Sequence, residues 1–582
     1  MTKIILRDIP ATASQHLLES GYSSILAKIF ASRGITDNKQ LSTSFVDLLP
    51  FDKLKNSREM ARLMADAITT QKKIVVIADY DADGATACAV AMRGLRTFGA
   101  QVDFIVPNRF EYGYGLTPEI VHLASQIQPD ILLTVDNGIA SVDGVAEANH
   151  LGMQVLITDH HLPSDTLPDA ACIVNPNQPG CTFPSKNLAG VGVMFYVLVA
   201  LRAELRARGT FHVSAEPKLA NLLDLVALGT IADVVRLDQN NRILVQQGLL
   251  RIRAGQACAG INALLHVAKK DTIRTSSQDL GFAIGPRLNA AGRLDDMTLG
   301  INCLLTDEPT VALSIATKLD SLNRERRSIE TEMQESALAA FEKITNNSLV
   351  SQKVVSDTPS ATSLVLFDEG WHQGVIGILA SRLKDKFHRP TIAFARSNNG
   401  EIKGSGRSIT GLHLRDTLDI VSKKYPALIK SFGGHAAAAG LSIAEDDFNI
   451  FVDIFEKTTS DLLSSNDLMK HIETDGMLDH NEMNLEIAQS LQEQVWGQGF
   501  PAPQFINHFI VKNQRVVAEK HLKLKLEVKN RTIDAILFGY NEALPNQIQA
   551  VYSLDINEYK GNSSVQLIIR HWKESDQFPD LG

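Results

Sequence analysis

Three aspartates, two residues apart, stand directly after an apolar stretch. Asp79, Asp81 and Asp83 belong to "VVIADYDADGATA", residues 75–87. Carboxylates held this close repel one another, and burial adds a hydration cost, unless a cation or hydrogen-bond donors compensate. The spacing therefore predicts a cation site, and carboxylate oxygens suit divalent ions such as Mg²⁺ or Mn²⁺.

Two further apolar runs end in the same way. The run 131–135 ends at the Asp-Asn-Gly of residues 136–138, and the run 155–157 is followed by the Asp-His-His of residues 159–161. Apolar runs of this length, bounded by turn residues and alternating with helical patterns, are typical of a parallel sheet buried on both faces. The sequence therefore predicts βαβ units.

Ligands of open parallel sheets bind beyond the carboxyl ends of the strands, so these polar residues should meet at one edge. The residues expected there are Asp79, Asp81, Asp83, Asp136, Asp159, His160 and His161. Taken alone, an Asp-Asn-Gly is usually a turn and a His-His pair usually a solvated loop. Three apolar runs that end in polar residues on the same side of one sheet favour a functional site.

Asp233 is a further candidate, because it lies within the apolar run 222–237, where an unpaired carboxylate is costly. It could instead be the N-cap of the next helix. Carboxylates with one imidazole and no thiolate suit Mn²⁺ or Mg²⁺ better than structural zinc. Two such ions, about 3.5–4 Å apart and bridged by a shared aspartate, are the usual arrangement for in-line displacement at phosphorus. The residues thus predict a dinuclear phosphoesterase.

The motifs "DYDADGATA", "VDNGI", "TDHH" and "GTIADVV" resemble those of the DHH phosphoesterase family, in the same order. The stretches 285–296, 371–383, 404–408 and 433–440 resemble the RecJ branch, bacterial exonucleases specific for single-stranded DNA. The resemblance covers most of the chain. It implies 5′→3′ degradation to 5′-mononucleotides by two-metal hydrolysis, in DNA recombination and repair.

The resemblance also assigns metal ligands. It makes Asp81 a ligand of the first ion and Asp83 a ligand of the second, with Asp136 bridging both. His160 and Asp233 complete the set of ligands around the second ion.

The catalytic residues expected beside these ligands are His161, Asp159 and Asp79. The resemblance implies that His161 faces the scissile phosphate rather than a metal, which fits the opposite directions of adjacent side chains in extended backbone. Asp159 and Asp79 would orient their neighbours. One position departs from the family, since Ile77 stands where many members carry a histidine. Fewer protein groups are therefore expected around the first ion.

Arginines and glycine-rich stretches suggest where phosphates bind. Arg109 and Arg287 lie in loops with Gly or Pro, and the alternative for each is an ordinary salt bridge. In "IKGSGRSI", Ser405 and Arg407 would bind phosphate, unless the stretch is only a hairpin turn. His435 in "GGHAAAAG" is a further candidate, the alternative being a tight helix start. The three arginines together could recognise a terminal 5′ phosphate.

The chain from about residue 470 changes to short alternating strands with turn signals, which suit a five-stranded OB-fold. In "KHLKLKLEV", Lys523 and Lys525 share one face with His521, whereas leucines occupy the other. We expect this face, with aromatics such as Tyr552 or Tyr559, to bind single-stranded DNA. The alternative is a solvated sheet face.

The predicted fold class is a multidomain α/β protein. A parallel-sheet DHH domain with a helical N-terminal segment is expected over 1–308 and a long connecting helix over 309–345. An α/β DHHA1 domain would follow over 360–455 and an all-β OB-fold over 470–575. A cleft between the two lobes would admit one strand and exclude a duplex.

The composition agrees with this organisation. A chain of 582 residues with 44% hydrophobic residues is too long for one core. The five cysteines form no CxxC pair, which argues against disulfides and zinc ribbons. The longest apolar run, residues 188–201, is shorter than the roughly 20 residues of a membrane span. With no signal peptide recognised, a cytoplasmic monomer is expected.

Single-stranded DNA is the expected partner, with a single-strand-binding protein and a helicase as further candidates. The net charge of −9 does not exclude nucleic acid, because bound cations would neutralise clustered carboxylates. A phosphodiesterase for short oligonucleotides or cyclic dinucleotides is an alternative, which the C-terminal β-module disfavours. A non-catalytic scaffold is another, which the intact ligand set disfavours.

Overall fold

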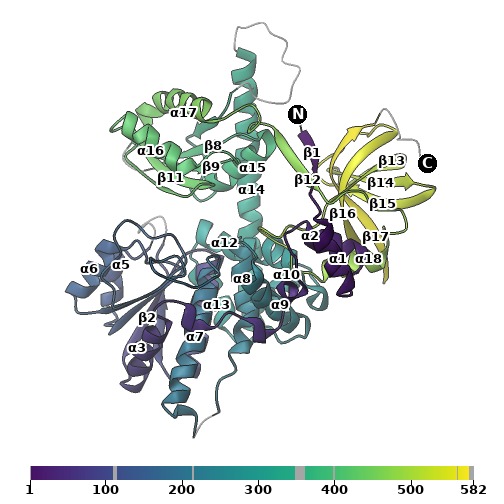
Figure 1. Ribbon diagram of the computed structural model, residues 1–582. Coiled ribbons are helices and arrows are strands. Elements are labelled where there is room, and N and C mark those ends of the chain that lie inside the picture. Colours follow the sequence, from purple (N-terminus) through teal and green to yellow (C-terminus); the bar gives the residue numbers. More distant parts are fainter. Residues whose placement is uncertain are drawn as a thin grey trace. The chain divides into compact units, whose positions relative to one another are not determined.

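The computed structural model describes residues 2–108, 115–212, 215–347, 361–397, 400–559 and 561–575 (Figure 1). The chain divides into two compact units. One contains Met1–Ile5 and Ser321–Ile472, and the other contains Leu6–Asp320 and Glu473–Gly582.

The second of these units contains a five-stranded parallel sheet in the order β3-β2-β4-β5-β6. Its strands are β2 (Lys73–Ala78), β3 (Gln101–Ile105), β4 (Ile131–Val135), β5 (Gln154–Thr158) and β6 (Cys172–Val174). The central strands are almost fully buried, because helices cover both faces. The predicted parallel sheet is thereby confirmed.

Helices on the two faces come from the segments between the strands. On one face, α5 (Pro118–Ser125) and α6 (Val142–His150) pack their apolar residues against β2, β4 and β5. The other face is covered by α4 (Ala82–Thr97) and α7 (Gly190–Ala207), and α3 (Ser57–Thr69) packs on α7. The long apolar run of the sequence is thus largely the buried helix α7.

Further helices extend this unit. At the N-terminal end, the strand β1 (Thr2–Leu6) belongs to the other unit except for its last residue, whereas α1 (Ala11–Glu19) and α2 (Ser24–Ala31) belong to this one. After α7 come α8 (Leu223–Ala232), α9 (Gln239–Arg253), α10 (Ala259–Val267), α11 (Ser277–Asp279), a π-helix (Leu280–Ile284), α12 (Gly285–Leu294) and α13 (Thr298–Leu305). Asp233 follows the last residue of α8, whereas Asp238 caps α9 by accepting the N–H of Asn241. The N-cap alternative for Asp233 is therefore wrong.

The C-terminal part of the same unit is a closed barrel in the order β13-β14-β15-β17-β16, preceded by α18 (Leu485–Gln492). Its strands are β13 (Phe505–Val517), β14 (His521–Val528), β15 (Arg531–Leu537), β16 (Gln547–Tyr559) and β17 (Asn562–Glu574). Leu522, Leu524 and Leu526 are buried, as the alternation predicts. The predicted five-stranded OB-fold is confirmed.

Tyr552 is not available to stack bases, contrary to our expectation. It is fully buried, and its hydroxyl donates to Asn507 Oδ1 at 2.8 Å. The reason is a register shift between Val551 and Tyr552, which breaks the alternation of β16 and turns both side chains inward. The side chain of Tyr559 lies outside the part that the structure describes.

The other unit is built on a five-stranded mixed sheet in the order β10-β11-β9-β8-β7, in which only β7 and β8 run parallel. The strands are β7 (Leu364–Asp368), β8 (Thr391–Arg396), β9 (Glu401–Arg407), β10 (Ser431–Gly434) and β11 (Ala438–Ala444). Its helices are α15 (Ile376–Phe387), α16 (Leu414–Lys424) and α17 (Phe448–Leu462), and β12 (Lys470–Thr474) pairs with β1.

Both glycine-rich motifs of this unit are strands. Ser405 and Arg407 lie within β9 rather than in a hairpin turn. The motif 433–440 forms the β10–β11 hairpin, with His435 in its turn, so the helix-start alternative is wrong.

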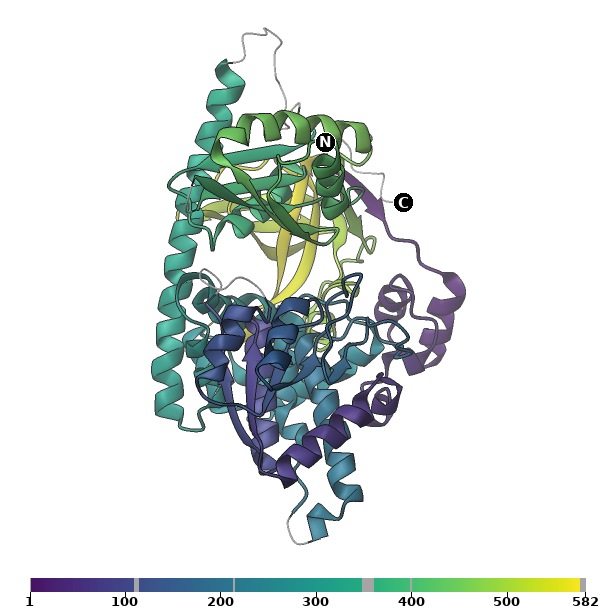
Figure 2. The same cartoon turned by 90° about the vertical axis from the view of Figure 1, so that its left-hand side faces the viewer.

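The predicted connecting helix is present as α14 (Pro309–Asn347), a single helix of 39 residues. It is the long teal helix in Figure 2. The division between the two units falls within it. Residues 348–360, which follow this helix, lie outside the described residues. Across the helices that are described, none combines the length and the apolar character needed to cross a membrane.

Phe451 on α17 tests the core of the 321–472 unit. It is fully buried, stacks on Phe455 and meets Phe394 edge-on. Phe451→Ala should lower the free energy of unfolding of this unit by about 3–5 kcal/mol, because it leaves a cavity. Hydrogen exchange of β8 and β9 amides measures the effect. Its helix neighbour Ile450, 54% exposed, is the control, and equal losses for Phe451→Ala and Ile450→Ala would contradict the assignment.

Candidate metal centre

The predicted ligands meet beyond the carboxyl ends of β2, β4 and β5. The side chains form three sets, and within each set the ligand atoms lie within 4.8 Å of one another. They are Asp79, Asp81 and Asp136, then Asp83, His160 and Asp233, and finally Asp136, His160 and His161. Every expected ligand belongs to at least one set, and Asp136 and His160 each belong to two.

Helix N-termini hold two of the carboxylates. Asp83 accepts hydrogen bonds from the N–H groups of Gly190, at 2.6 Å, and Val191, at 2.9 Å, in the first turn of α7. Asp81 is the N-cap of α4 and accepts from the N–H groups of Asp83 and Gly84. The unpaired N–H groups and dipole of a helix start favour negative charge, so both helices stabilise the acidic cluster.

Asp136 occupies an unusual backbone conformation. Its φ is 63°, in the left-handed region, which aspartate tolerates better than most residues. Asn137 stabilises the turn by donating to the carbonyl oxygens of Ile77 and Val135. Val234, directly after Asp233, has a φ of 64°, which is strained for a β-branched residue. Strained backbone thus accompanies two candidate ligands.

Close helix packing against this site requires glycine at two positions. A Cβ on Gly190 would lie 2.4 Å from Asp136 Oδ1, so only glycine lets α7 begin at this point. A Cβ on Gly292 of α12 would lie 1.9 Å from the carbonyl oxygen of Tyr80. On the same helix, Asn289 accepts the N–H of Ala82 at 2.8 Å. Helices α7 and α12 therefore press directly on the acidic loop.

Asp159 organises its own loop. One oxygen accepts from the backbone N–H groups of His160 and His161 and lies 2.8 Å from His161 Nδ1, and the other accepts from the N–H of Ile139. Burial alone would raise the pKa of Asp159, but its hydrogen bonds and the nearby imidazoles lower it. These contacts agree with the orienting role expected for Asp159.

The two histidines have opposite protonation tendencies. Burial lowers the pKa of His160, with a further contribution from His161, so its imidazole favours the neutral form that ligates metals. Burial would also lower the pKa of His161, but the hydrogen bond and charge of Asp159, with Asp79 and Asp233, raise it to about 9. His161 is therefore a cation in the metal-free protein at neutral pH.

Repulsion within the cluster is strong. Burial, followed by neighbouring carboxylates, raises the pKa of Asp83 and of Asp233 to about 7 and the pKa of Asp136 well above its ordinary value. A bound cation favours the charged form and would lower these pKa values again. Ionising these carboxylates therefore costs free energy in the folded protein, and a divalent ion would offset that cost.

The donor set fits a hard divalent cation. His160 Nε2 lies 3.1 Å from Asp136 Oδ1 and 3.6 Å from Asp233 Oδ2. His160 Nε2 and Asp233 Oδ2 are both buried and make no hydrogen bond with the described part of the chain. Buried polar atoms normally have partners, so their convergence indicates an ion site. Ile77 is fully buried in the apolar core and adds no ligand.

Sequence reasoning missed several residues that position this site. Asn175 donates to the carbonyl oxygen of His161 and Asn177 to that of His160. Gly190 and Asn289 complete the set. Their only sequence signal is a polar or small residue beside a helix start or strand end, a pattern too common to single them out.

The predicted phosphate-binding residues have varied environments. Arg287 is largely buried, pairs with Asp320 at 2.7 Å and donates to the carbonyl oxygen of Ala283. In the 321–472 unit, Arg407 donates to Ser405 Oγ at 3.2 Å beside Gly377 of α15. His435 is exposed in its hairpin turn. Their roles remain predictions.

Two of the predicted residues lie on the barrel, and a third, Arg109, is outside the described residues. Lys523 and Lys525 lie on the outer face of the barrel, where Lys525 is exposed and Lys523 is half-buried. Their DNA contact also remains a prediction.

Three family models match the chain. The model of the DHH family, N-terminal domain, matches residues 73–230, the DHHA1 domain matches 357–461, and the RecJ OB domain matches 474–571. The single-stranded-DNA-specific exonuclease RecJ of Escherichia coli (strain K12) is 46% identical over 574 residues, 97% of each chain. The chain belongs to the RecJ family.

More distant RecJ proteins are also similar. The RecJ of Bacillus subtilis (strain 168) is 31% identical over 94% of this chain and 67% of its own length. A crystal structure of RecJ in complex with Mn²⁺, from Thermus thermophilus, has a TM-score of 0.80 at 27% identity, over 99% of this chain and 80% of that one. The Mg²⁺ complex of RecJ from the same organism has a TM-score of 0.75 at 26% identity, over 99% and 79%.

Gly190→Ala tests how α7 positions Asp136. The added methyl group would displace the Asp136 carboxylate, and we expect Mn²⁺ to bind about 10–100-fold more weakly, as when other positioning groups are lost. Titration calorimetry measures the affinity. Gly192→Ala is the matched control, because its Cβ would meet only the Leu188 side chain, at 3.2 Å. Wild-type affinity in Gly190→Ala would show that Asp136 does not contribute a ligand.

Asp159→Asn tests the protonation of His161. In the metal-free wild type, the raised pKa of His161 stabilises the fold fully below about pH 6.5, the usual unfolded value, and this contribution is lost as pH rises through about 9. The variant should lower the pKa of His161, because the hydrogen bond and the charge of Asp159 are lost whereas burial remains. Titration of the His161 ring protons by NMR measures it, and an unchanged pKa would contradict the pairing.

Proposed function

We propose that the protein is a single-stranded-DNA-specific exonuclease that hydrolyses phosphodiester bonds with two divalent ions, Mn²⁺ or Mg²⁺. The observation that carries this proposal is the convergence of the acidic and imidazole groups at one sheet edge, in a chain that belongs to the RecJ family. The five ligands that the resemblance assigns, Asp81, Asp83, Asp136, His160 and Asp233, are all present in the sequence, which disfavours a non-catalytic scaffold.

The two ions divide the ligands between them. Asp81 and Asp136, with Asp79 nearby, would hold the first, and Asp83, His160 and Asp233 would hold the second with Asp136 shared. When bound, such a pair supplies activation of the attacking water and stabilises charge on the leaving oxygen.

The remaining chemistry belongs to side chains of the chain. His161, held by Asp159, would face the scissile phosphate and donate a hydrogen bond to the charge that develops there. Asp79 would orient the loop through the N–H of Tyr80, which its carboxylate accepts at 2.8 Å. His161 would therefore act through its charge beside the phosphate, and Asp79 through the position that it gives to the loop.

Phosphate-binding residues would select the strand end. Arg109, Arg287, Ser405, Arg407 and His435 are proposed to bind the terminal 5′ phosphate and the following backbone, giving 5′→3′ polarity and 5′-mononucleotide products. The OB barrel would bind the strand through Lys523 and Lys525. A cytoplasmic role in recombination and repair, with substrate delivered by a helicase or single-strand-binding protein, completes the proposal.

A phosphodiesterase for short oligonucleotides or cyclic dinucleotides is the second candidate function. The metal ligands alone are compatible with it, but a small substrate would have no use for the barrel at residues 505–574. We therefore favour a long single strand.

Asp136→Asn tests the function directly. Purified protein with Mn²⁺ should release mononucleotides stepwise from the 5′ end of an end-labelled single-stranded oligonucleotide. Asp136→Asn should reduce the rate at least about a hundredfold, because it removes a shared ligand. Gel analysis of 5′- and 3′-labelled substrates measures both the rate and the direction.

Asp143→Asn, which changes an exposed carboxylate on α6, is the matched control and should leave the rate unchanged. Release from the 3′ end would contradict the terminal-phosphate proposal. Hydrolysis of dinucleotides without cleavage of long strands would favour the second candidate function.

A further inference from the structure

An aromatic side chain on the outer face of the barrel has no role in the core or the metal centre. Phe538 directly follows β15 and is 54% exposed. Its ring meets that of His521, the first residue of β14, edge-on, with 5.1 Å between centroids and 78° between planes. His521 is itself held, because its Nδ1 accepts the N–H of Gly539 at 3.0 Å. The barrel therefore presents a pre-organised pair of rings to solvent.

Three cationic side chains lie next to this pair. Lys523 and Lys525 share the face of His521 on β14, and Arg515 of β13 is the cross-strand neighbour of Lys523. Within the described residues none of these three forms an ion pair, although Asp534 stands opposite Lys525 in the register. Alternate side chains of a strand recur about every 6.7 Å, so rings and cations form a row along β14.

We propose that Phe538 and His521 stack on one base of a single DNA strand whose phosphates lie along Arg515, Lys523 and Lys525. An aromatic face stacks on any base without sequence preference, and a cationic groove follows the backbone. This inference rests on the proposed function and extends it to a specific contact on the barrel. We call Phe538 and His521 the platform. It takes the base-stacking role expected of Tyr552, which the register shift buries.

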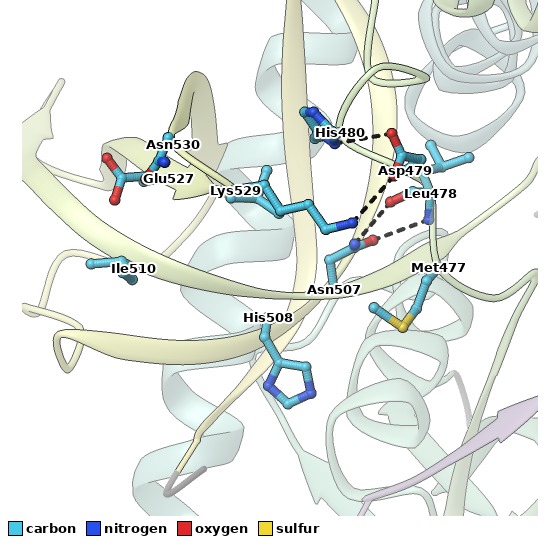
Figure 3. A pocket seen from close by; sticks show the side chains of 11 residues that line it. Met477, Leu478, Asp479, His480, Asn507, His508, Ile510, Glu527, Lys529 and Asn530 are labelled. Carbon is cyan, nitrogen blue, oxygen red and sulfur yellow. Dashed lines mark hydrogen bonds and ion pairs between the residues drawn. The ribbon is translucent and has the colours of Figure 1, made fainter. Parts of the chain in front are cut away.

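A cavity of about 400 Å³ lies where β14 ends, and Figure 3 shows the side chains that line it. Asp479 Oδ1 lies 2.9 Å from His480 Nδ1, and Asp479 Oδ2 pairs with Lys529 at 3.4 Å, so the lysine beside this cavity is already neutralised. Its walls include the exposed Met477. The cavity lacks the free positive charge that a phosphate backbone needs, and its residues provide matched controls.

The test measures how tightly the full-length protein binds labelled (dT)30 after metal removal, so that no cleavage occurs. Phe538→Ala should weaken binding about tenfold or more, because one stacked base is lost. Phe538→Trp should bind like the wild type, and DNA should quench the fluorescence of the new indole. Met477→Ala should bind like the wild type.

The salt dependence tests the cationic row. Lys523→Ala should lower the slope of log K against log salt by about 0.7, the value for one phosphate contact on a single strand. Lys529→Ala removes a lysine that is already paired and should leave the slope unchanged. Thermal melting of each variant checks that the barrel is intact.

Wild-type binding of (dT)30 by a folded Phe538→Ala, or no quenching in Phe538→Trp, would overturn the platform. Should Phe538→Ala fail to fold, Phe538→Trp and Lys523→Ala decide the question.

Hydrolysis of a short oligonucleotide with Mn²⁺ tests the metal centre separately. A wild type that binds (dT)30 but hydrolyses no oligonucleotide would overturn the proposed function, whereas normal hydrolysis with unaltered Phe538→Ala binding rejects the platform alone.

Discussion

Repulsion among buried carboxylates is the constraint on which the rest of this structure depends. Burial and neighbouring charge raise the pKa values of Asp83, Asp136 and Asp233 together. The chain offsets part of the cost with backbone N–H groups, which α7 donates to Asp83 and α4 donates to Asp81. The negative charge that remains would favour the binding of a divalent ion.

This arrangement requires rigid support. The parallel sheet brings three strand ends to one edge, and the helices reach it closely only because Gly190 and Gly292 have no side chain. Left-handed backbone at Asp136 and Val234 costs free energy that packing around the site must offset. The geometry is thus held by the fold before any ion binds.

Charge is distributed unevenly, and this reconciles an acidic protein with a polyanionic substrate. The net charge of −9 includes the carboxylates that metal ions would neutralise. On the barrel, by contrast, Lys523 and Lys525 extend from a strand whose leucines fill the core. Local patterns of charge, rather than their sum, therefore decide what each surface can bind.

The sequence by itself determined the parallel sheet, the long helix, the five-stranded barrel and the acidic residues that are candidate metal ligands. Each of these features corresponds to a local pattern of apolar and polar residues. Only the tertiary structure decided that Asn175 and Asn177 hold the loop of the two histidines, that Arg287 pairs with Asp320, and that Tyr552 is buried whereas Phe538 is exposed. These outcomes depend on a bulge or on side chains that fold together from distant segments. Such contacts leave no periodic signal in the chain, since they arise only when the elements pack.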